Sequence, residues 1–337
     1  MEMPPWLDEY APQVPLNTLV ERVNQIFHAL NAANYDREHP EIHEQLPPIW
    51  KEMLAQLPPD RDWRVLDFGC GTGFEASQAL HGLGNRVDKL VAYDLSPEML
   101  AQCRLNVQKF GKVVFCSQIE DLGRHGPFNL LLTNSLLHHL PCIEETLKFL
   151  LPTLTDDSYW LAGHEPSNRF YMNSNCLTFL KAFNDSRQRE KWLTPSRYSK
   201  KLKTYLSKLK SGGPISPYRA TAIAAVEQGL FKKIPTDRII DRIVDFHVAH
   251  SGEEVISGRG LDFENMQKEL SPEWKLEWVT TYAYFGDVNP MQVSQKWTER
   301  SRQIARRYPN DGANFSTVWS RHAHARVTLP SDCVSPG

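Results

Sequence analysis

Hydrophobic positions recur with two different periods along the chain, and the change of period divides it into stretches. Over residues 1–60 the apolar positions repeat every three or four residues, as on one face of a helix. A second helix is expected from Ile42 to Leu57, broken or restarted at Pro47 and Pro48 because proline lacks the N–H of a helical hydrogen bond. The polar segment 34–40 between the helices predicts a turn-like linker. The first helix is expected from its apolar stripe: Leu16, Leu19, Val20, Val23, Ile26, Phe27 and Leu30.

Residues 61–165 alternate short apolar runs with helical windows such as Ser96–Phe110 and Ile143–Leu154. This alternation is typical of a parallel sheet with helices on both faces. We therefore predict an α/β fold with a doubly wound sheet. Five runs are expected to be its strands: Val65–Phe68, Lys89–Asp94, Lys112–Cys116, Phe128–Thr133 and Ser158–Ala162.

The alternation stops after residue 165. Residues 166–272 have a mostly helical pattern interrupted by prolines, which predicts a helical cap inserted into the α/β domain. Residues 273–327 return to a strand pattern that is expected to complete the sheet, and residues 328–337 are expected to be a disordered tail. The returning elements are expected at Trp274–Phe285 for a strand, Pro290–Arg307 for a helix and Asn314–Ser320 for a last strand.

Composition excludes several classes of protein. Of the 337 residues, 41% are hydrophobic and 23% are charged, which is enough apolar material for a sizeable core and excludes disorder across the whole chain. No uncharged apolar run approaches the about 20 residues of a membrane span. A net charge of −2 argues against a protein built to bind nucleic acid. Residues 1–8 hold no basic residue before an apolar run, so we expect no secretory signal and a cytoplasmic location.

The cysteines are scattered and form no C-x-x-C pair, so we expect reduced thiols and no zinc site of the usual cysteine spacing. They are Cys70, Cys103, Cys116, Cys142, Cys176 and Cys333.

The strongest motif lies at residues 65–74, where a D-x-G-x-G-x-G string leaves a predicted strand and enters a predicted helix. Glycines allow the backbone to turn sharply and let a ligand approach without a Cβ in the way. A second acid, Asp94, ends the next predicted strand, where a ribose-binding acid is expected. The competing interpretation is NAD binding, but its G-x-G-x-x-G spacing is absent, and Asp67 would repel a pyrophosphate while suiting an ammonium group.

These motifs resemble those of class I S-adenosylmethionine (SAM)-dependent methyltransferases. Residues 65–73 are similar to the family's first motif and residues 91–100 to its second. Residues 118–122 resemble the adenine-contacting segment, with Gln118 where many members have Asp. Residues 128–140 resemble the fourth-strand motif.

The resemblance covers residues 60–165 and, less closely, 273–326, and it implies a seven-stranded Rossmann-like sheet that binds SAM. It also implies roles for individual residues. The methionine and ribose side of SAM would be held by Asp67, Gly69, Cys70, Gly71 and Gly73, and the ribose hydroxyls by Asp94. The other implied contacts are Leu95, Met99, Gln118 and Ile119 at adenine, Asn134 and His139 at the sulfonium, and Tyr35 over the methionine part.

Candidate catalytic residues follow the expected strands. His164 and Glu165 end the fifth strand, at the edge where open α/β sheets bind ligands, so either could deprotonate an acceptor or simply form a hydrogen-bonded turn. Tyr171 could offer an aromatic face to a sulfonium or pack in the cap core. Asn134 completes this set of candidates.

Other polar clusters have plainer interpretations. The pair His138–His139 could bind a metal, but in the family it resembles the pair shapes the cofactor pocket, and we expect no metal there. His247 and His250 are expected to pack or lie at the surface, again with no metal. The basic segment 187–210 is expected to be an amphipathic helix with a solvated face, the alternative being attraction of an acidic substrate or RNA.

The sequence therefore favours methyl transfer from SAM to a small-molecule acceptor by in-line displacement, with the protein mainly positioning and desolvating the reactants. Two alternatives remain. In the first, SAM is the sole substrate: its amino group attacks its own γ-carbon, which releases methylthioadenosine and forms azetidine-2-carboxylate, as in azetidine-2-carboxylate synthases of methyltransferase-like fold. In the second, the chain binds SAM without turnover.

Overall fold

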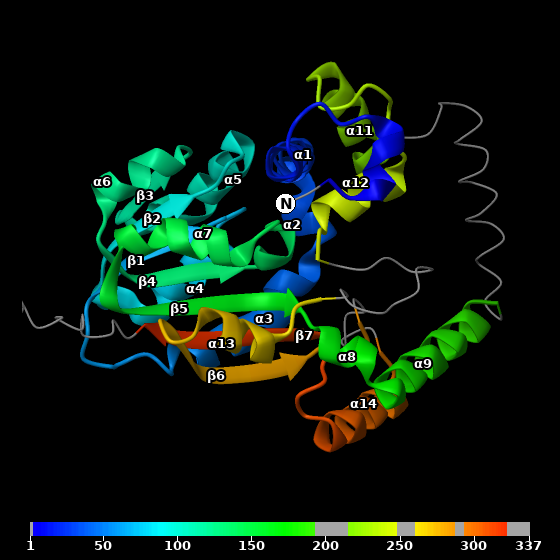
Figure 1. Cartoon of the computed structure of the whole chain (residues 1–337). Coiled ribbons are helices and arrows are strands. Elements are labelled where there is room, and N and C mark those ends of the chain that lie inside the picture. The colour runs from blue at the N-terminus through cyan, green and yellow to red at the C-terminus, as the bar shows by residue number, and fades with distance from the viewer. Residues whose placement is uncertain (1–2, 193–214, 248–259, 287–292, 322–337) are drawn as a thin grey trace, which may run out of the picture.

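The computed structural model describes residues 3–192, 215–247, 260–286 and 293–321. At its centre lies a seven-stranded sheet with the order β3-β2-β1-β4-β5-β7-β6 (Figure 1). Strand β7 runs antiparallel to its neighbours β5 and β6, whereas the pairs from β3 to β5 are parallel. The strands are β1 Trp63–Phe68, β2 Val87–Tyr93, β3 Val113–Cys116, β4 Phe128–Asn134, β5 Leu154–Pro166, β6 Trp274–Tyr282 and β7 Asn314–Arg321.

The central strands are continuous apolar runs because helices cover both faces of the sheet. One face packs against α3 (Pro40–Leu54), α4 (Phe74–Leu83) and α5 (Pro97–Val107). The other face packs against α6 (Leu122–His125), α7 (Ile143–Leu150) and α13 (Phe263–Leu270). The predicted doubly wound α/β fold is confirmed, with strand β5 longer than the sequence pattern indicated. None of the described helices is long and apolar enough to cross a membrane.

Two predictions for the N-terminal region were wrong. Helix α3 is continuous through Pro47 and Pro48, although each removes a helical hydrogen bond. The completely buried side chains of Leu46, Trp50 and Met53 explain this continuity, because their packing against the sheet offsets the lost bonds. The expected linker 34–40 also contains a short helix, α2 (Tyr35–Glu38).

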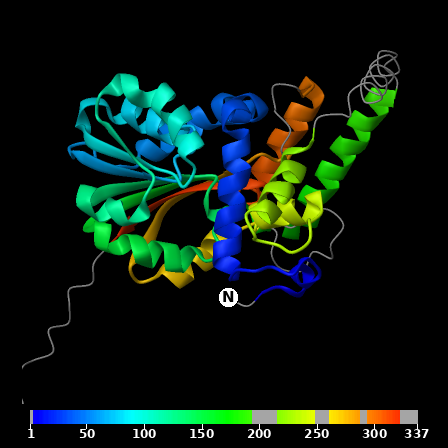
Figure 2. The ribbon, with the colours of Figure 1, turned by 90° about the horizontal axis from the view of Figure 1, so that it is seen from above.

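The expected cap over residues 166–272 is not one packing unit in the described part of the chain. Its helices α11 (Pro217–Glu227) and α12 (Asp237–Val244) share an apolar cluster with α1 (Leu16–Asn31). Figure 2 shows α1 standing between these two helices and the sheet domain. The remaining helices pack elsewhere: α8 (Asn168–Met172) and α9 (Ser174–Trp192) against α14 (Gln295–Arg307), and α13 on the sheet.

Short 3₁₀ turns connect several of these elements. Among them are η2 (Ala32–Asn34), which joins α1 to α2, and η6 (Leu137–His139), which follows β4. The others are η1 Pro5–Tyr10, η3 Gly84–Arg86, η4 Gln108–Phe110, η5 Ile119–Asp121 and η7 Leu151–Thr153. The predicted tail 328–337, Cys333, His250 and residues 193–210 of the basic segment lie outside the described residues.

Candidate functional site

A cavity of about 370 Å³ opens at the carboxyl ends of β1, β2 and β4. Its volume lies within the about 300–1,000 Å³ of small-molecule sites. The chain reverses its direction across the sheet between β1 and β4, and open α/β sheets bind ligands at that point. Ten residues predicted for the cofactor site line this cavity: Tyr35, Gly69, Cys70, Gly71, Asp94, Leu95, Met99, Ile119, Asn134 and His139.

The glycine loop after β1 is fixed to the end of β2 by backbone hydrogen bonds. The N–H groups of Gly69 and Cys70 donate to the Tyr93 carbonyl at 2.8 and 2.9 Å. Gly73 has φ +88° and leads into α4, so the turn needs a residue free to adopt the left-handed region. The loop therefore presents its backbone to the cavity in a fixed conformation.

Asp94 is oriented by two backbone donors. Its Oδ2 accepts from the N–H of Gly71 at 2.9 Å, and its Oδ1 accepts from the N–H of Ser96 at 2.8 Å. Each carboxylate oxygen keeps a second lone pair with which to accept a bond from a ligand hydroxyl. Burial raises the pKa of Asp94 to about 6, while the two backbone donors favour its ionised form. At neutral pH, Asp94 is thus an ionised acceptor inside the cavity.

A second carboxyl, that of Asp67 on β1, is completely buried, and neither oxygen has a hydrogen-bond partner. Burial raises its pKa, and the charge of Asp94 adds to this effect. The neighbouring Glu75, at the start of α4, lines the cavity, and burial and Asp67 raise its pKa as well. Of these two acids, Glu75 is the one that can meet a ligand in the cavity. Asp67 itself does not line the cavity.

Asn134, at the end of β4, is held by a residue from another helix. Its Oδ1 accepts from Trp50 Nε1 at 3.1 Å, and Trp50 belongs to α3. Gly163 on β5 makes this contact possible, because a Cβ there would lie 2.6 Å from Asn134 Oδ1. The bond leaves the amide NH₂ of Asn134 as a donor beside the cavity.

Helix α1 supplies a wall of the cavity that the sequence analysis missed. A polar row on α1 lines it, and Gln25 Nε2 also donates to the Leu95 carbonyl at 2.9 Å. This bond closes α1 over the end of β2. The row has helical spacing opposite the apolar stripe, but such a row is usually solvated, so spacing alone could not assign it to a site. Its members are Asn17, Glu21, Asn24, Gln25 and His28.

Two neutral histidines face each other in the cavity. The ring centroids of His28 and His139 are 5.3 Å apart. Burial and neighbouring histidines lower the pKa of His28 to about 3. Burial and the adjacent His138 lower the pKa of His139 to about 4. Both imidazoles are therefore uncharged at neutral pH and can donate or accept hydrogen bonds.

Three residues predicted for the cofactor site lie behind the cavity surface rather than in its lining. Asp67 lies below the glycine loop, and Gly73 packs against α5 through Cys103. Gln118 precedes η5, where its carbonyl accepts from Cys116 Sγ at 3.1 Å and from the N–H of Asp121 at 3.1 Å. These residues shape the loops around the cavity.

The structure argues against three of the four candidate catalytic residues, since among them only Asn134 lines the described cavity. Both Glu165 oxygens are buried and occupied: Oε1 accepts from the N–H groups of Leu136 and Leu137, each at 2.9 Å. His164 points instead to the Tyr282 hydroxyl, with Nδ1 3.1 Å away, and burial lowers its pKa to about 4. Tyr171 packs in the cluster around α8, α9 and α14.

Among the described residues, the Asp, Glu, Lys and Arg side chains that line the cavity are all acids. Four carboxyl side chains reach its surface, and among the described lining residues none is Lys or Arg. The aromatic rings of Phe68 and Tyr93 also line it and are stacked at 4.9 Å between centroids. Acids and aromatic faces together favour a cationic ligand. The four carboxyls belong to Glu21, Glu75, Asp94 and Glu145.

Part of the chain is similar to known methyltransferases. Residues 59–197 match the sequence profile of a methyltransferase domain. No curated protein is significantly similar to the chain. One similar solved structure is the plantazolicin methyltransferase BpumL in complex with a triazolic desmethylPZN analogue and SAH (S-adenosylhomocysteine). Its sequence is 14% identical, the alignment covers 91% of this chain and 97% of that chain, and the TM-score is 0.45.

A second similar solved structure is that of a "putative S-adenosylmethionine dependent methyltransferase" from Listeria monocytogenes. Its sequence is 17% identical, the alignment covers 81% of this chain and 96% of that chain, and the TM-score is 0.42. The matched domain contains the glycine loop, Asp94 and all the parallel strands β1 to β5. The glycine loop and Asp94 both line the cavity. The chain accordingly contains a methyltransferase domain, matched over residues 59–197, which includes the parallel strands of the seven-stranded sheet.

Proposed function

We propose that this enzyme transfers the methyl group of SAM to a small-molecule acceptor that is neutral or positively charged. The observation that carries the proposal is the charge of the cavity: among the described residues, its ionisable lining groups other than histidine, cysteine and tyrosine are all carboxylic acids. An anionic acceptor would be repelled by Glu21 and Glu145, whereas a neutral or cationic acceptor would not.

SAM, when bound, supplies a methyl group already activated by a sulfonium. The protein's own residues would bind and orient: Asp94 accepts hydroxyl bonds, and the Asn134 amide donates beside the glycine loop. Helix α1, tied to the end of β2 through Gln25, excludes water from one side of the cavity. Positioning and desolvation of this kind can contribute several kcal/mol to a displacement reaction. Neutral His28 and His139 offer hydrogen-bonding groups to an acceptor.

The test is an incubation of the full-length protein with methyl-deuterated SAM and small metabolites. The metabolites are first separated by ion exchange into anionic, neutral and cationic fractions, and the products are identified by mass spectrometry. We expect S-adenosylhomocysteine together with a deuteromethylated product from the neutral or cationic fraction. The variant Asp94→Ala should yield much less of both. Labelling restricted to the anionic fraction would contradict the proposed acceptor class.

The same incubation decides between methyl transfer and the two alternatives. Methylthioadenosine formed from SAM alone would support the cyclisation reaction and overturn methyl transfer. SAM binding without either product, in the presence of all three fractions, would support a protein that binds SAM without turnover.

A further inference from the structure

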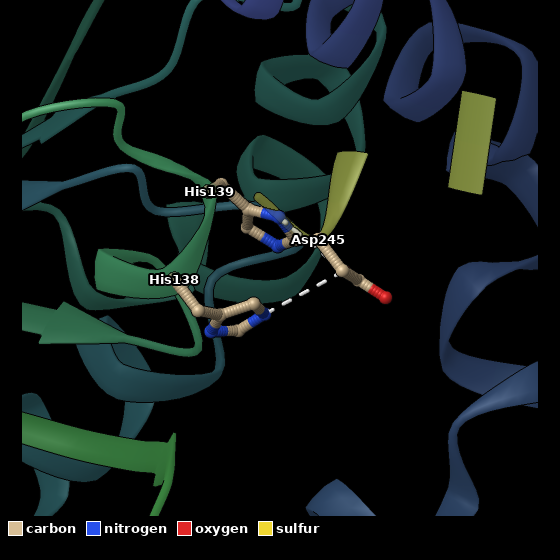
Figure 3. A group of neighbouring side chains, drawn as sticks. All are labelled: His138, His139 and Asp245. Carbon is tan, nitrogen blue, oxygen red and sulfur yellow. Dashed lines mark ion pairs between the residues drawn. The ribbon is translucent and has the colours of Figure 1, made fainter. Parts of the chain in front are cut away.

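Two neighbouring histidines and a distant aspartate meet at the edge of the cavity. His138 and His139 belong to η6, and Asp245 follows α12, so these residues come from the sheet domain and from the helices packed on α1. Figure 3 shows the two imidazoles side by side with Asp245 across from them. We propose that His138, His139 and Asp245 bind a divalent transition-metal ion.

The distances between the three side chains fit such an ion. A single oxygen, Asp245 Oδ1, lies 3.8 Å from His138 Nε2 and 3.6 Å from His139 Nδ1. Donor atoms from all three residues lie within 4.8 Å of one another. With bonds of about 2.0–2.2 Å and tetrahedral geometry, zinc holds its donor atoms roughly 3.3–3.6 Å apart. The 3.8 Å between Asp245 Oδ1 and His138 Nε2 is close to this separation, so small side-chain movements would let the three residues close on one ion.

The surroundings already orient His138 as they orient metal-binding histidines. His138 Nδ1 lies 2.8 Å from Glu165 Oε2, so the Nδ1–H donates to this buried carboxylate and the lone pair of Nε2 faces Asp245. A carboxylate or carbonyl behind the second ring nitrogen is the usual partner of a histidine that binds a metal. This arrangement gives Glu165, which cannot reach the cavity, a positioning role.

The segment that carries Asp245 is held against η6 by three hydrogen bonds. The Val244 carbonyl lies 2.6 Å from His139 Nδ1. The N–H of His247 donates to the His138 carbonyl at 3.0 Å, and His247 Nε2 donates to the Leu140 carbonyl at 2.8 Å. The Val244 contact fixes the Nδ1–H of His139, which leaves Nε2 as its metal-binding atom. The three ligands are thus brought together by the fold, across 105 residues of sequence between His139 and Val244.

The ligand set indicates the class of ion. Two imidazoles and one carboxylate suit zinc, iron(II) or cobalt(II), and three protein ligands leave a coordination position open. His139 lines the cavity, so this open position lies next to the site of methyl transfer. The ion would bind an oxygen or nitrogen atom of the acceptor there, a role that rests on the proposed function. The metal site itself does not depend on it.

Metal binding is tested on tag-free, full-length protein that has been treated with a chelator and dialysed. Zinc is titrated calorimetrically and cobalt(II) by its visible absorption, in the absence of SAM and of any acceptor. We expect saturable binding of one ion and a cobalt spectrum typical of low coordination number. Asp245→Asn should weaken zinc binding about tenfold or more, because it removes a charged ligand without changing the size of the side chain.

The matched control is Asp156→Asn, an exposed carboxylate on β5 that should leave zinc affinity unchanged. His139→Gln provides a second ligand variant, and circular dichroism establishes that each variant is folded. All other histidines remain in every variant, so binding elsewhere on the chain cannot imitate the difference. The absence of saturable binding, or equal zinc affinity in wild type and both ligand variants, would overturn the metal site. Intact SAM binding in the same stripped protein would leave the methyltransferase proposal standing.

Discussion

The backbone N–H of Gly71 donates to Asp94 Oδ2 at 2.9 Å, although the two residues follow different strands. The bond ties the glycine loop after β1 to the acid after β2. It fixes one carboxylate oxygen of Asp94 while leaving a lone pair on it for a ligand. The protein's own hydrogen bonds thus hold this side of the cavity in place.

The glycine loop yields a first prediction, which compares Gly73→Ala with Gly71→Ala. A Cβ at Gly73 would lie 2.8 Å from Cys103 Sγ and 3.3 Å from the Cys103 Cα, at φ +88°. We expect Gly73→Ala to lower the free energy of unfolding by about 2–4 kcal/mol, from left-handed strain and overpacking together. At Gly71 a Cβ meets no atom within 4 Å, so only the strain of about 1–2 kcal/mol remains. Chemical denaturation measures both, and equal losses would contradict this interpretation.

Gly163 provides a second prediction, because it makes room for the Trp50–Asn134 hydrogen bond. A Cβ there would lie 2.6 Å from Asn134 Oδ1 and 3.0 Å from Trp50 Nε1. We expect Gly163→Ala to displace Asn134, to cost about 1–3 kcal/mol of stability and to reduce turnover more than it reduces SAM affinity. Turnover, SAM affinity and denaturation are measured for each variant.

The matched control for this variant is Gly123→Ala in α6, where an added Cβ meets no atom within 4 Å. It should change stability by no more than about 1 kcal/mol and leave turnover intact. A Gly163→Ala enzyme with wild-type turnover would show that the position of Asn134 does not matter for the reaction.

Periodicity and motif spacing predicted most of the sheet, and physical chemistry explains why. Parallel strands buried on both faces must be apolar throughout, so each appears in the sequence as a short run. The glycine loop and Asp94 could also be predicted from the sequence. A ligand-binding loop after the first strand needs residues that adopt positive φ, and the acid that accompanies it follows the next strand. Helix α3 was predicted to break because the effect of Pro47 is local, whereas the packing of Trp50 that offsets it is not.

The rest of the site depends on where side chains point and how helices pack, and residue types alone do not determine either. The sequence left open whether Glu165 faces an acceptor or forms a hydrogen-bonded turn, and the structure shows its oxygens bonded to the residues around η6. The polar row of α1 resembles an ordinary solvated face until α1 is placed over the sheet. Asp245 becomes a neighbour of His138 only because α12 packs on α1.

The pH dependence of SAM affinity follows from the pKa of Asp94, which burial raises to about 6. A ligand hydroxyl donates to the ionised carboxylate, so affinity should fall as the pH drops below this pKa. At about one pH unit below it, only about a tenth of Asp94 is ionised, and affinity should be about tenfold lower than at neutral pH. Calorimetric titration at about pH 5 and pH 7 measures the change.

Asp94→Asn serves as the control for this pH effect, because the pKa of the neighbouring Asp67 is raised as well. The variant should bind SAM more weakly and almost independently of pH. A wild-type pH dependence retained in Asp94→Asn would assign the effect to another group.

The most direct test of the account is the affinity of SAM for the wild-type protein, for Asp94→Ala and for Asp88→Ala. Asp88 lies near the other end of β2, is mostly exposed and forms an ion pair with Arg64, so its loss should leave SAM affinity unchanged. Loss of Asp94 should weaken binding by roughly 1.5–3 kcal/mol, or about 10- to 150-fold, as expected for charge-assisted hydrogen bonds. Equal SAM affinity in all three proteins would contradict the placement of the cofactor between the glycine loop and Asp94.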